Sequence, residues 1–285
     1  MENDIKKEAG TEADRIRSEN EALRDRIKAL EEENEHLKSE VGMATRMKFH
    51  LMPNVYPAFP DIPNFDIYAD MVAIRQLGGD YYDFYRLDND HIGIVVADIF
   101  DGGTAAALFM VAFKLYMTSQ QWIDDDIADK IRNVNESLCF ENTDNLSLSA
   151  WYGEYEISTG TLVAVNAGHE PPLLLHDGKV VPIPEEKISY LIGVIGGVKY
   201  TSYEVKLSDG DKLLLYTDGV TLARSDKGEM FGREHLVSTF ENSRNSDSEE
   251  TVGLLERELS TFIKGCELSE DATFLCISKK GRVRS

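Results

Sequence analysis

The pattern of hydrophobic and polar positions divides the chain into two parts with different periods. In the first part, apolar and small residues recur at alternating spacings of three and four. This 3.5-residue repeat places them on one stripe of a helix, as in the seam of a coiled coil. The a positions are Ala13, Asn20, Ile27, Asn34 and Val41, and the d positions are Ile16, Leu23, Leu30, Leu37 and Ala44. The pattern predicts a coiled-coil dimerisation and linker helix over residues 1–48.

The residues beside the seam indicate how two such helices would pair. In a parallel, in-register dimer, each g residue meets the e residue five positions later on the partner helix. These pairs are opposite in charge: Glu19 with Arg24, Arg26 with Glu31, and Glu33 with Lys38. Asn20 and Asn34, paired across the seam, would fix register and oligomer state. The pattern favours a parallel homodimer, with a single solvated helix as the alternative.

Prolines end the helical pattern. Pro53 and Pro57 follow the seam, and proline cannot continue a helix because it lacks the N–H donor and clashes with the preceding turn. We therefore expect the helix to stop near Met52. Residues 49–64 form the predicted proline-containing linker, and residues 65–285 form the predicted globular domain.

The globular part alternates strand and helix patterns. Turn signals such as Asp177-Gly178 and Asp209-Gly210 separate several strands, which favours antiparallel pairing. The predicted strands cover residues 65–73, 91–97, 146–156, 161–166, 172–176, 202–207, 212–217 and 272–278, and the predicted helices cover residues 104–121, 126–140, 232–241 and 249–264. This order predicts an α+β fold with two antiparallel sheets and helices packed outside them.

Composition narrows the possible functions. The chain has 30 Lys and Arg against 51 Asp and Glu, a formal charge of −21, which argues against nucleic-acid binding. The longest apolar run, residues 105–113, is too short for a membrane span, which needs about 20 residues. The charged N-terminus does not resemble a secretory signal. The three cysteines lack metal-ligand spacing, so we expect free thiols and a cytoplasmic location.

Acidic residues stand where predicted strands start or stop. Asp80 and Asp83 lie in GGDYYDFY, Asp98 follows a buried strand, and Asp218 closes another. Glu270 and Asp271 open the last predicted strand. A single Asp in such a place is normally a turn former or helix cap. Four sites together suggest convergence, and converging carboxylates repel one another unless a cation such as Mg²⁺ or Mn²⁺ lies among them.

The order of the motifs resembles a known family. GGDYYDFY, VADIFDGGTAAALFM, NAGHEPPLL, LLLYTDGV, GEMFG and EDATFLCI occur in that order. Together they are similar to the SpoIIE/RsbU branch of the PPM metal-dependent protein serine/threonine phosphatases, over residues 44 to 279. The resemblance implies an α-β-β-α sandwich. It also implies hydrolysis of phosphoserine or phosphothreonine on a regulatory protein, by family resemblance a STAS-type anti-sigma-factor antagonist, through a water activated by two divalent cations, Mn²⁺ or Mg²⁺.

The resemblance also assigns roles to residues. Asp98 matches the family's bridging metal ligand, and Asp80, Asp98 and Asp218 match the carboxylates with the catalytic role. The implied metal ligands are Asp80, Asp98, the carbonyl of Ile99, Asp218, Glu270 and Asp271.

The chain departs from the family pattern after Ile99. Phe100, Asp101 and Gly102 stand where the family usually has Ser-Gly-His or Ser-Gly-Lys, and Glu270 replaces an Asp. Three functions therefore remain open at this point: an active phosphatase, a degenerate phosphatase that binds a phosphoprotein without turnover, and a structural coiled-coil scaffold.

Overall fold

The computed structural model describes residues 2–73, 78–100, 102–120, 126–183 and 189–281. The chain divides into two compact units, Met1–Met47 and Lys48–Ser285. No helix among the described residues combines the length and the apolar character that a membrane span requires.

Helix α1 (Glu2–His50) accounts for the first unit and continues for three residues into the second. Its apolar seam residues are about half exposed: Ile16 48%, Leu23 59%, Ile27 55%, Leu30 46% and Leu37 52%. The chain is helical from Glu2 to His50, and the helix ends before Pro53, since proline cannot continue it. A partner helix along the seam stays a prediction.

The second unit contains two five-stranded antiparallel sheets. One sheet has the order β1-β10-β9-β6-β7 and the other the order β2-β3-β4-β5-β8. The first sheet comprises β1 (Phe65–Val72), β6 (Leu173–His176), β7 (Lys179–Val181), β9 (Lys212–Tyr216) and β10 (Ala272–Lys279). The second comprises β2 (Tyr81–Arg86), β3 (His91–Phe100), β4 (Ser147–Glu156), β5 (Thr161–Ala167) and β8 (Ser202–Lys206).

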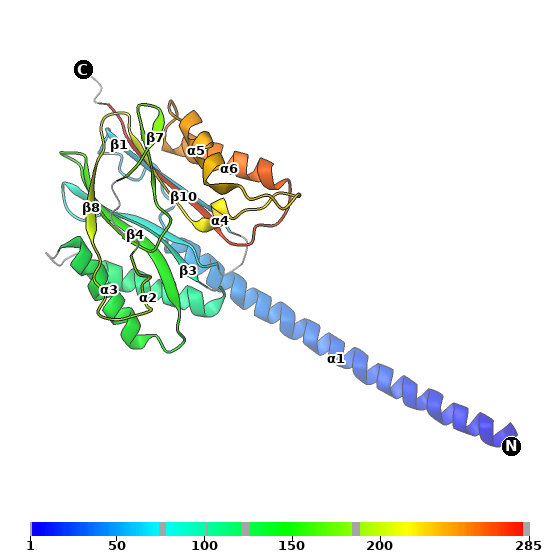
Figure 1. Ribbon diagram of the computed structural model, residues 1–285. Helices are drawn as coiled ribbons and strands as arrows, with labels where there is room; N and C mark the ends of the chain where they lie inside the picture. The colour runs from blue at the N-terminus through cyan, green and yellow to red at the C-terminus, as the bar shows by residue number, and fades with distance from the viewer. Residues whose placement is uncertain (1, 74–77, 101, 121–125, 184–188, 282–285) are drawn as a thin grey trace. The chain divides into compact units, whose positions relative to one another are not determined.

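Helices cover the outer faces of the two sheets (Figure 1). Helices α2 (Thr104–Gln120) and α3 (Ile127–Glu141) pack together and contact strands β3 and β5. On the other side, α6 (Ser248–Ile263) contacts β1 and β10, and α5 (Gly232–Asn242) contacts β6 and β7. The predicted α-β-β-α sandwich of two antiparallel sheets is therefore confirmed.

The structure also contains three short elements that the sequence pattern did not predict. Strand β2 carries aromatic residues on both faces, so it lacks the alternation expected of a half-buried strand. Strand β7 is only three residues long. Helix α4 (Asp218–Thr221) is a single turn that begins at the predicted site residue Asp218. Strand β3 also runs two residues beyond Asp98, so Asp98 lies within the strand rather than after it.

Apolar side chains fill the space between the sheets and beneath the helices. Trp151 on β4 is fully buried and donates a hydrogen bond from its indole nitrogen to the Tyr203 hydroxyl at 2.7 Å. The segment between α1 and β1 also contributes, because Met52 and Ile62 are buried in the same core. The predicted linker of residues 49–64 is thus packed against the sandwich along part of its length.

Candidate metal centre

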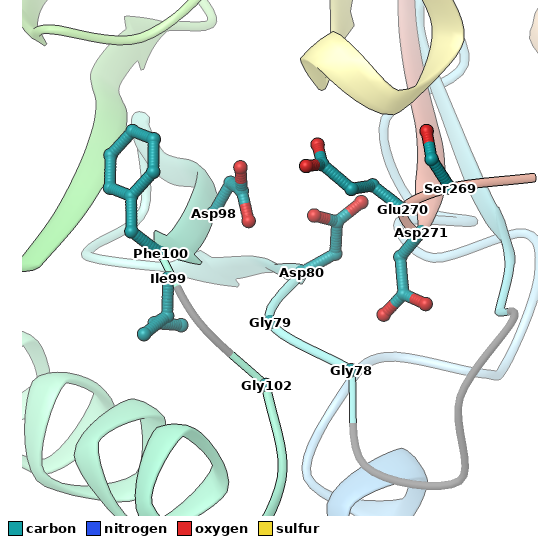
Figure 2. A pocket seen from close by; sticks show the side chains of 10 residues that line it. All are labelled: Gly78, Gly79, Asp80, Asp98, Ile99, Phe100, Gly102, Ser269, Glu270 and Asp271. Carbon is teal, nitrogen blue, oxygen red and sulfur yellow. The ribbon is translucent and has the colours of Figure 1, made fainter. Parts of the chain in front are cut away.

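A pocket of about 230 Å³ lies where the ends of the two sheets meet (Figure 2). Three chain segments line it: the segment before β2, the end of β3, and the segment before β10. The lining residues are Gly78, Gly79, Asp80, Asp98, Ile99, Phe100, Gly102, Ser269, Glu270 and Asp271. Since β2 and β3 belong to one sheet and β10 to the other, only the packed sandwich creates this pocket.

Asp80 links the two sheets through hydrogen bonds. Its side chain is buried, and its Oδ2 accepts from the hydroxyls of Thr217 at 2.7 Å and Thr273 at 2.5 Å. Burial raises the pKa of Asp80 well above its usual range, and the nearby charge of Asp98 raises it further. The two threonine hydrogen bonds act in the opposite direction, because they stabilise the ionised carboxylate.

Asp98 projects from β3 into the pocket. Burial, followed by the charge of Asp218, raises the pKa of Asp98 from 3.8 to about 6. Figure 2 shows the carboxylates of Asp80, Asp98 and Glu270 directed toward one another, whereas the Ile99 side chain points to the opposite side of β3. Three acidic groups from distant parts of the chain therefore converge in one pocket.

The glycines of the GGD and TDG motifs permit close backbone approach. A Cβ atom on Gly79 would lie 2.3 Å from the Ile99 carbonyl oxygen and 3.0 Å from Asp98 Oδ1. A Cβ on Gly219 would lie 2.0 Å from the carbonyl oxygen of Asp271. Any side chain at these positions would displace the acidic residues, so the glycines are required by the packing of the site.

Two of the predicted acids occupy the edge of the centre. Asp218 is the first residue of α4 and does not line the pocket, although its charge raises the pKa of both Asp98 and Glu170. The buried Asp271 points away from the three facing carboxylates (Figure 2). It lies against Gly78, where a Cβ would be only 1.5 Å from Asp271 Oδ2.

Lys48 is a site residue that the sequence analysis did not identify. It is buried, its ammonium donates a hydrogen bond to the Gly78 carbonyl at 2.5 Å, and it lies 4.0 Å from Asp271 Oδ2. Burial lowers the pKa of Lys48, and the negative charges of Asp271, Asp80 and Asp98 oppose that change. The available signal was a lysine at the next a position after the apolar seam, where a buried residue is expected.

The residues of the pocket fit divalent cations that prefer oxygen ligands. The donors are carboxylates and a backbone carbonyl, with neither His nor Cys among the pocket residues. In the described parts of the chain, no three His, Cys, Asp or Glu side chains are grouped closely enough to hold one ion by themselves. Mg²⁺ commonly takes one or two carboxylates and keeps several waters, so this donor set matches its chemistry.

A family model described as stage II sporulation protein E (SpoIIE) matches residues 88–280. The chain belongs to the SpoIIE family. The matched region covers β3 to β10 and therefore includes Asp98, Asp218 and Glu270.

Curated relatives agree with this assignment. Protein IcfG of Synechocystis sp. is 28% identical over 247 residues, which are 77% of this chain and 39% of IcfG, so the chain spans well under half of that relative. Phosphoserine phosphatase RsbU of Bacillus subtilis is 26% identical over 247 residues, 86% of this chain and 72% of RsbU.

Solved structures show the same fold. The SiaA-PP2C domain of Pseudomonas aeruginosa has a TM-score of 0.74 at 17% identity, covering 86% of this chain and 98% of that domain. The PP2C phosphatase domain of SpoIIE from Bacillus subtilis, with a fragment of its regulatory domain, has a TM-score of 0.66 at 16% identity. The matched region covers 75% of this chain and 63% of the solved SpoIIE chain.

Other polar residues of the SpoIIE-like motifs have structural roles. The backbone of the buried His169 donates to and accepts from the side-chain amide of Asn166, which orders the loop. Burial lowers the pKa of His169 to about 4, so its imidazole is neutral at pH 7.

Asp83 lies on β2 and pairs with Lys114 at 2.5 Å. Asp126 caps α3 through the Ala128 N–H. Arg75, Asp101, Trp122, Asp124 and Asp125 lie outside the described residues.

Removing one hydroxyl that supports Asp80 should weaken metal binding. In Thr273→Val the shape is kept, but the hydrogen bond that favours the ionised carboxylate is lost. We expect Mn²⁺ affinity to fall by roughly 10-fold to 100-fold, as is usual when a supporting partner of a metal ligand is removed. Isothermal titration with Mn²⁺ measures this, and Thr239→Val, at a buried position on α5, is the control. Equal affinities in all three proteins would contradict the role of Thr273.

Proposed function

We propose that this SpoIIE-family chain is a metal-dependent phosphatase that hydrolyses phosphoserine or phosphothreonine on a regulatory protein. The observation that carries the proposal is the convergence of Asp80, Asp98 and Glu270 in one pocket between the two sheets. The name of the relative RsbU, a phosphoserine phosphatase, supports the same activity. By the same family resemblance, the substrate would be an anti-sigma-factor antagonist of the STAS type.

We further propose that the pocket binds two divalent cations, Mn²⁺ or Mg²⁺. Bound ions would supply a water of lowered pKa and neutralise the phosphoryl oxygens. The residues that would hold the ions are Asp80, Asp98, the Ile99 carbonyl, Asp218, Glu270 and Asp271. A solved relative, RsbX, was crystallised in complex with magnesium.

The chain's own residues would prepare the site for that chemistry. Thr217 and Thr273 hold the Asp80 carboxylate from the opposite sheet, which fixes its direction. Lys48 holds the Gly78 carbonyl and so positions the segment that leads to Asp80. Glu270 is exposed and carries one methylene more than the family's usual Asp, which lets its carboxylate extend over the pocket.

A phosphate-release assay tests the activity. The full chain with Mn²⁺ or Mg²⁺ should release phosphate from a phosphoserine-containing STAS-type domain, and a chelator should abolish release.

The second candidate, a phosphoprotein-binding module without turnover, is favoured by Phe100 and Gly102 in the altered loop and by Glu270. Tight binding of the phosphorylated domain without phosphate release would favour that candidate and contradict catalysis.

We also propose that α1 forms a parallel homodimer through its seam and that the protein acts in the cytoplasm. The half-exposed apolar seam residues support the dimer, because a long apolar stripe in water is unfavourable. The three free thiols, Cys139, Cys266 and Cys276, fit a reducing compartment.

Two changes in α1 should alter self-association in opposite directions. Deleting residues 1–40 removes most of the seam but keeps Lys48, so we expect a monomer or a much weaker dimer. Replacing both Asn20 and Asn34 with Val should strengthen association and relax oligomer choice, because the paired amides no longer penalise other arrangements. Analytical ultracentrifugation over a range of concentrations measures both effects. An equally tight dimer after the deletion would rule out the seam as the dimer contact.

A further inference from the structure

Phe100 stands on the same face of β3 as the metal-site residue Asp98. Side chains two residues apart on a strand point to the same side, and Figure 2 shows Phe100 and Asp98 on one side of the strand with Ile99 on the other. Phe100 is the aromatic residue among those that line the pocket and is 41% exposed. An apolar ring therefore borders a pocket whose other lining residues, apart from Ile99, are acidic residues, glycines and a serine.

The described residues beside Phe100 are small. Its partner across the β3–β4 pairing is Ser147, and the pocket residue that follows it in the described chain is Gly102. Neither side chain is large enough to cover a phenyl ring. The exposed part of Phe100 is therefore available to a molecule that enters the pocket.

The spacing along β3 indicates which part of a substrate would meet the ring. Two residues of a strand span roughly 7 Å. A phosphoryl group held near Asp98 would thus lie one side-chain spacing away from Phe100 on the same face of the strand. In a phosphoserine residue, the short Oγ–Cβ arm joins that group to the polypeptide, which brings the polypeptide within reach of the exposed Phe100.

We propose that Phe100 is a specificity-determining residue that contacts the substrate polypeptide beside the phosphorylated side chain and favours an apolar neighbour there. This inference rests on the proposed phosphatase function and adds a preference that the carboxylates alone cannot supply. Carboxylates and bound cations recognise a phosphoryl group on any carrier, whereas an aromatic ring gains contact energy only from apolar atoms next to it. Small phosphate esters, which lack a polypeptide, would not use Phe100.

Three substrates and three variants test this role in the full chain with Mn²⁺. The substrates are free O-phospho-L-serine, a phosphoserine peptide with leucine on both sides of the phosphoserine, and the same peptide with glycine on both sides. The variants are Phe100→Ser, Phe100→Leu, and the control Phe140→Ser. Phe140 is 90% exposed on α3 and does not line the pocket.

In Phe100→Ser we expect the preference for the leucine peptide over the glycine peptide to fall about tenfold, as when an aromatic anchor of an interface is removed. The change should appear mainly in the KM of the leucine peptide, so the ratio of kcat/KM between the two peptides reports it separately from any change in turnover. Phe100→Leu should keep most of the preference, and Phe140→Ser all of it. Equal losses on all three substrates, or an unchanged preference, would overturn the proposal.

Failure of the proposed function can be told apart from failure of this inference. If the unaltered chain with Mn²⁺ hydrolyses none of the substrates, the phosphatase proposal fails. The preference is then read from the Kd ratio of the two fluorescently labelled peptides, measured by anisotropy. A ratio that falls in Phe100→Ser supports the contact with Phe100. An unchanged ratio, or no binding of either peptide, overturns it.

Discussion

Replacing Asp98 with asparagine is expected to eliminate metal binding and hydrolysis while the fold is retained. The charge of Asp98 interacts with those of Asp80 and Asp218, so the substitution removes a carboxylate that would hold the metal from the centre of this acidic group. We expect turnover to fall by roughly 1,000-fold or more, the upper range for loss of a group that stabilises charge in a transition state. Titration calorimetry with Mn²⁺ and phosphate release measure the two losses.

The same substitution should stabilise the metal-free protein above pH 6. Because the pKa of Asp98 is raised in the folded state to about 6, folding disfavours its ionised form. The stability associated with the protonated form is complete below pH 4 and is lost as the pH rises through 6. Asparagine cannot ionise, so Asp98→Asn should be more stable than the unaltered protein by up to about 3 kcal/mol at pH 8, and equally stable at pH 4.

A neighbouring aspartate provides the control for this prediction. Asp83 is also buried but pairs with Lys114, so Asp83→Asn should lower stability by leaving a charge without its partner. Thermal unfolding with a chelator at pH 4, 6 and 8 compares the variants. Destabilisation of Asp98→Asn at pH 8, or unchanged Mn²⁺ affinity, would contradict the assignment of Asp98.

Replacing Lys48 with methionine is expected to impair both stability and turnover. Methionine is similar in length and apolar, so it can occupy the buried space, but it can neither donate to the Gly78 carbonyl nor balance the charge of Asp271. Breaking a buried charge pair typically costs about 3–5 kcal/mol, so the metal-free variant should unfold at a clearly lower temperature. Turnover should fall roughly 10-fold to 100-fold, because the segment that carries Asp80 loses its anchor.

Added metal should distinguish Lys48 from an ordinary buried lysine. Bound Mn²⁺ supplies positive charge to the same carboxylates, so it should restore much of the stability lost in Lys48→Met. Lys130 is the matched control, since it is also buried and pairs with Glu154 at 2.8 Å on a different part of the domain. Lys130→Met should lose stability without rescue by Mn²⁺ and keep its turnover. Similar behaviour of the two variants would show that Lys48 has no particular connection with the metal centre.

Much of the fold was predictable because most elements carry a clear local pattern. The long apolar run of β3 and the alternation of β1 mark strands wherever they lie in the fold. Strand β2 was missed because aromatic residues occupy both of its faces and Asp83 interrupts them. The structure shows that Asp83 is tolerated there because Lys114 from α2 neutralises it, which no local pattern can reveal.

The acidic part of the site was predictable for a related reason. Asp80 and Asp218 adjoin glycines, which mark places where the chain approaches other groups closely, and Asp98 follows the long apolar run of β3. The supporting residues carry no such mark. Thr273 bonds to Asp80 across 193 positions of sequence, and Lys48 bonds to Gly78 across 30. These partners become visible only when the segments are packed together.

The sequence alone determined the helix of the first unit, the two antiparallel sheets with their covering helices, and the set of acidic residues near strand ends. These features follow from periodicity and turn chemistry, which act over a few residues. Only the tertiary structure decided that Lys48 is buried beside the acids, that Asp271 points to Gly78, and that Phe100 shares a face with Asp98 at the mouth of the pocket. The physical reason is that the pocket lies between the two sheets, so the direction and charge environment of each side chain depend on segments that meet only when the sheets pack.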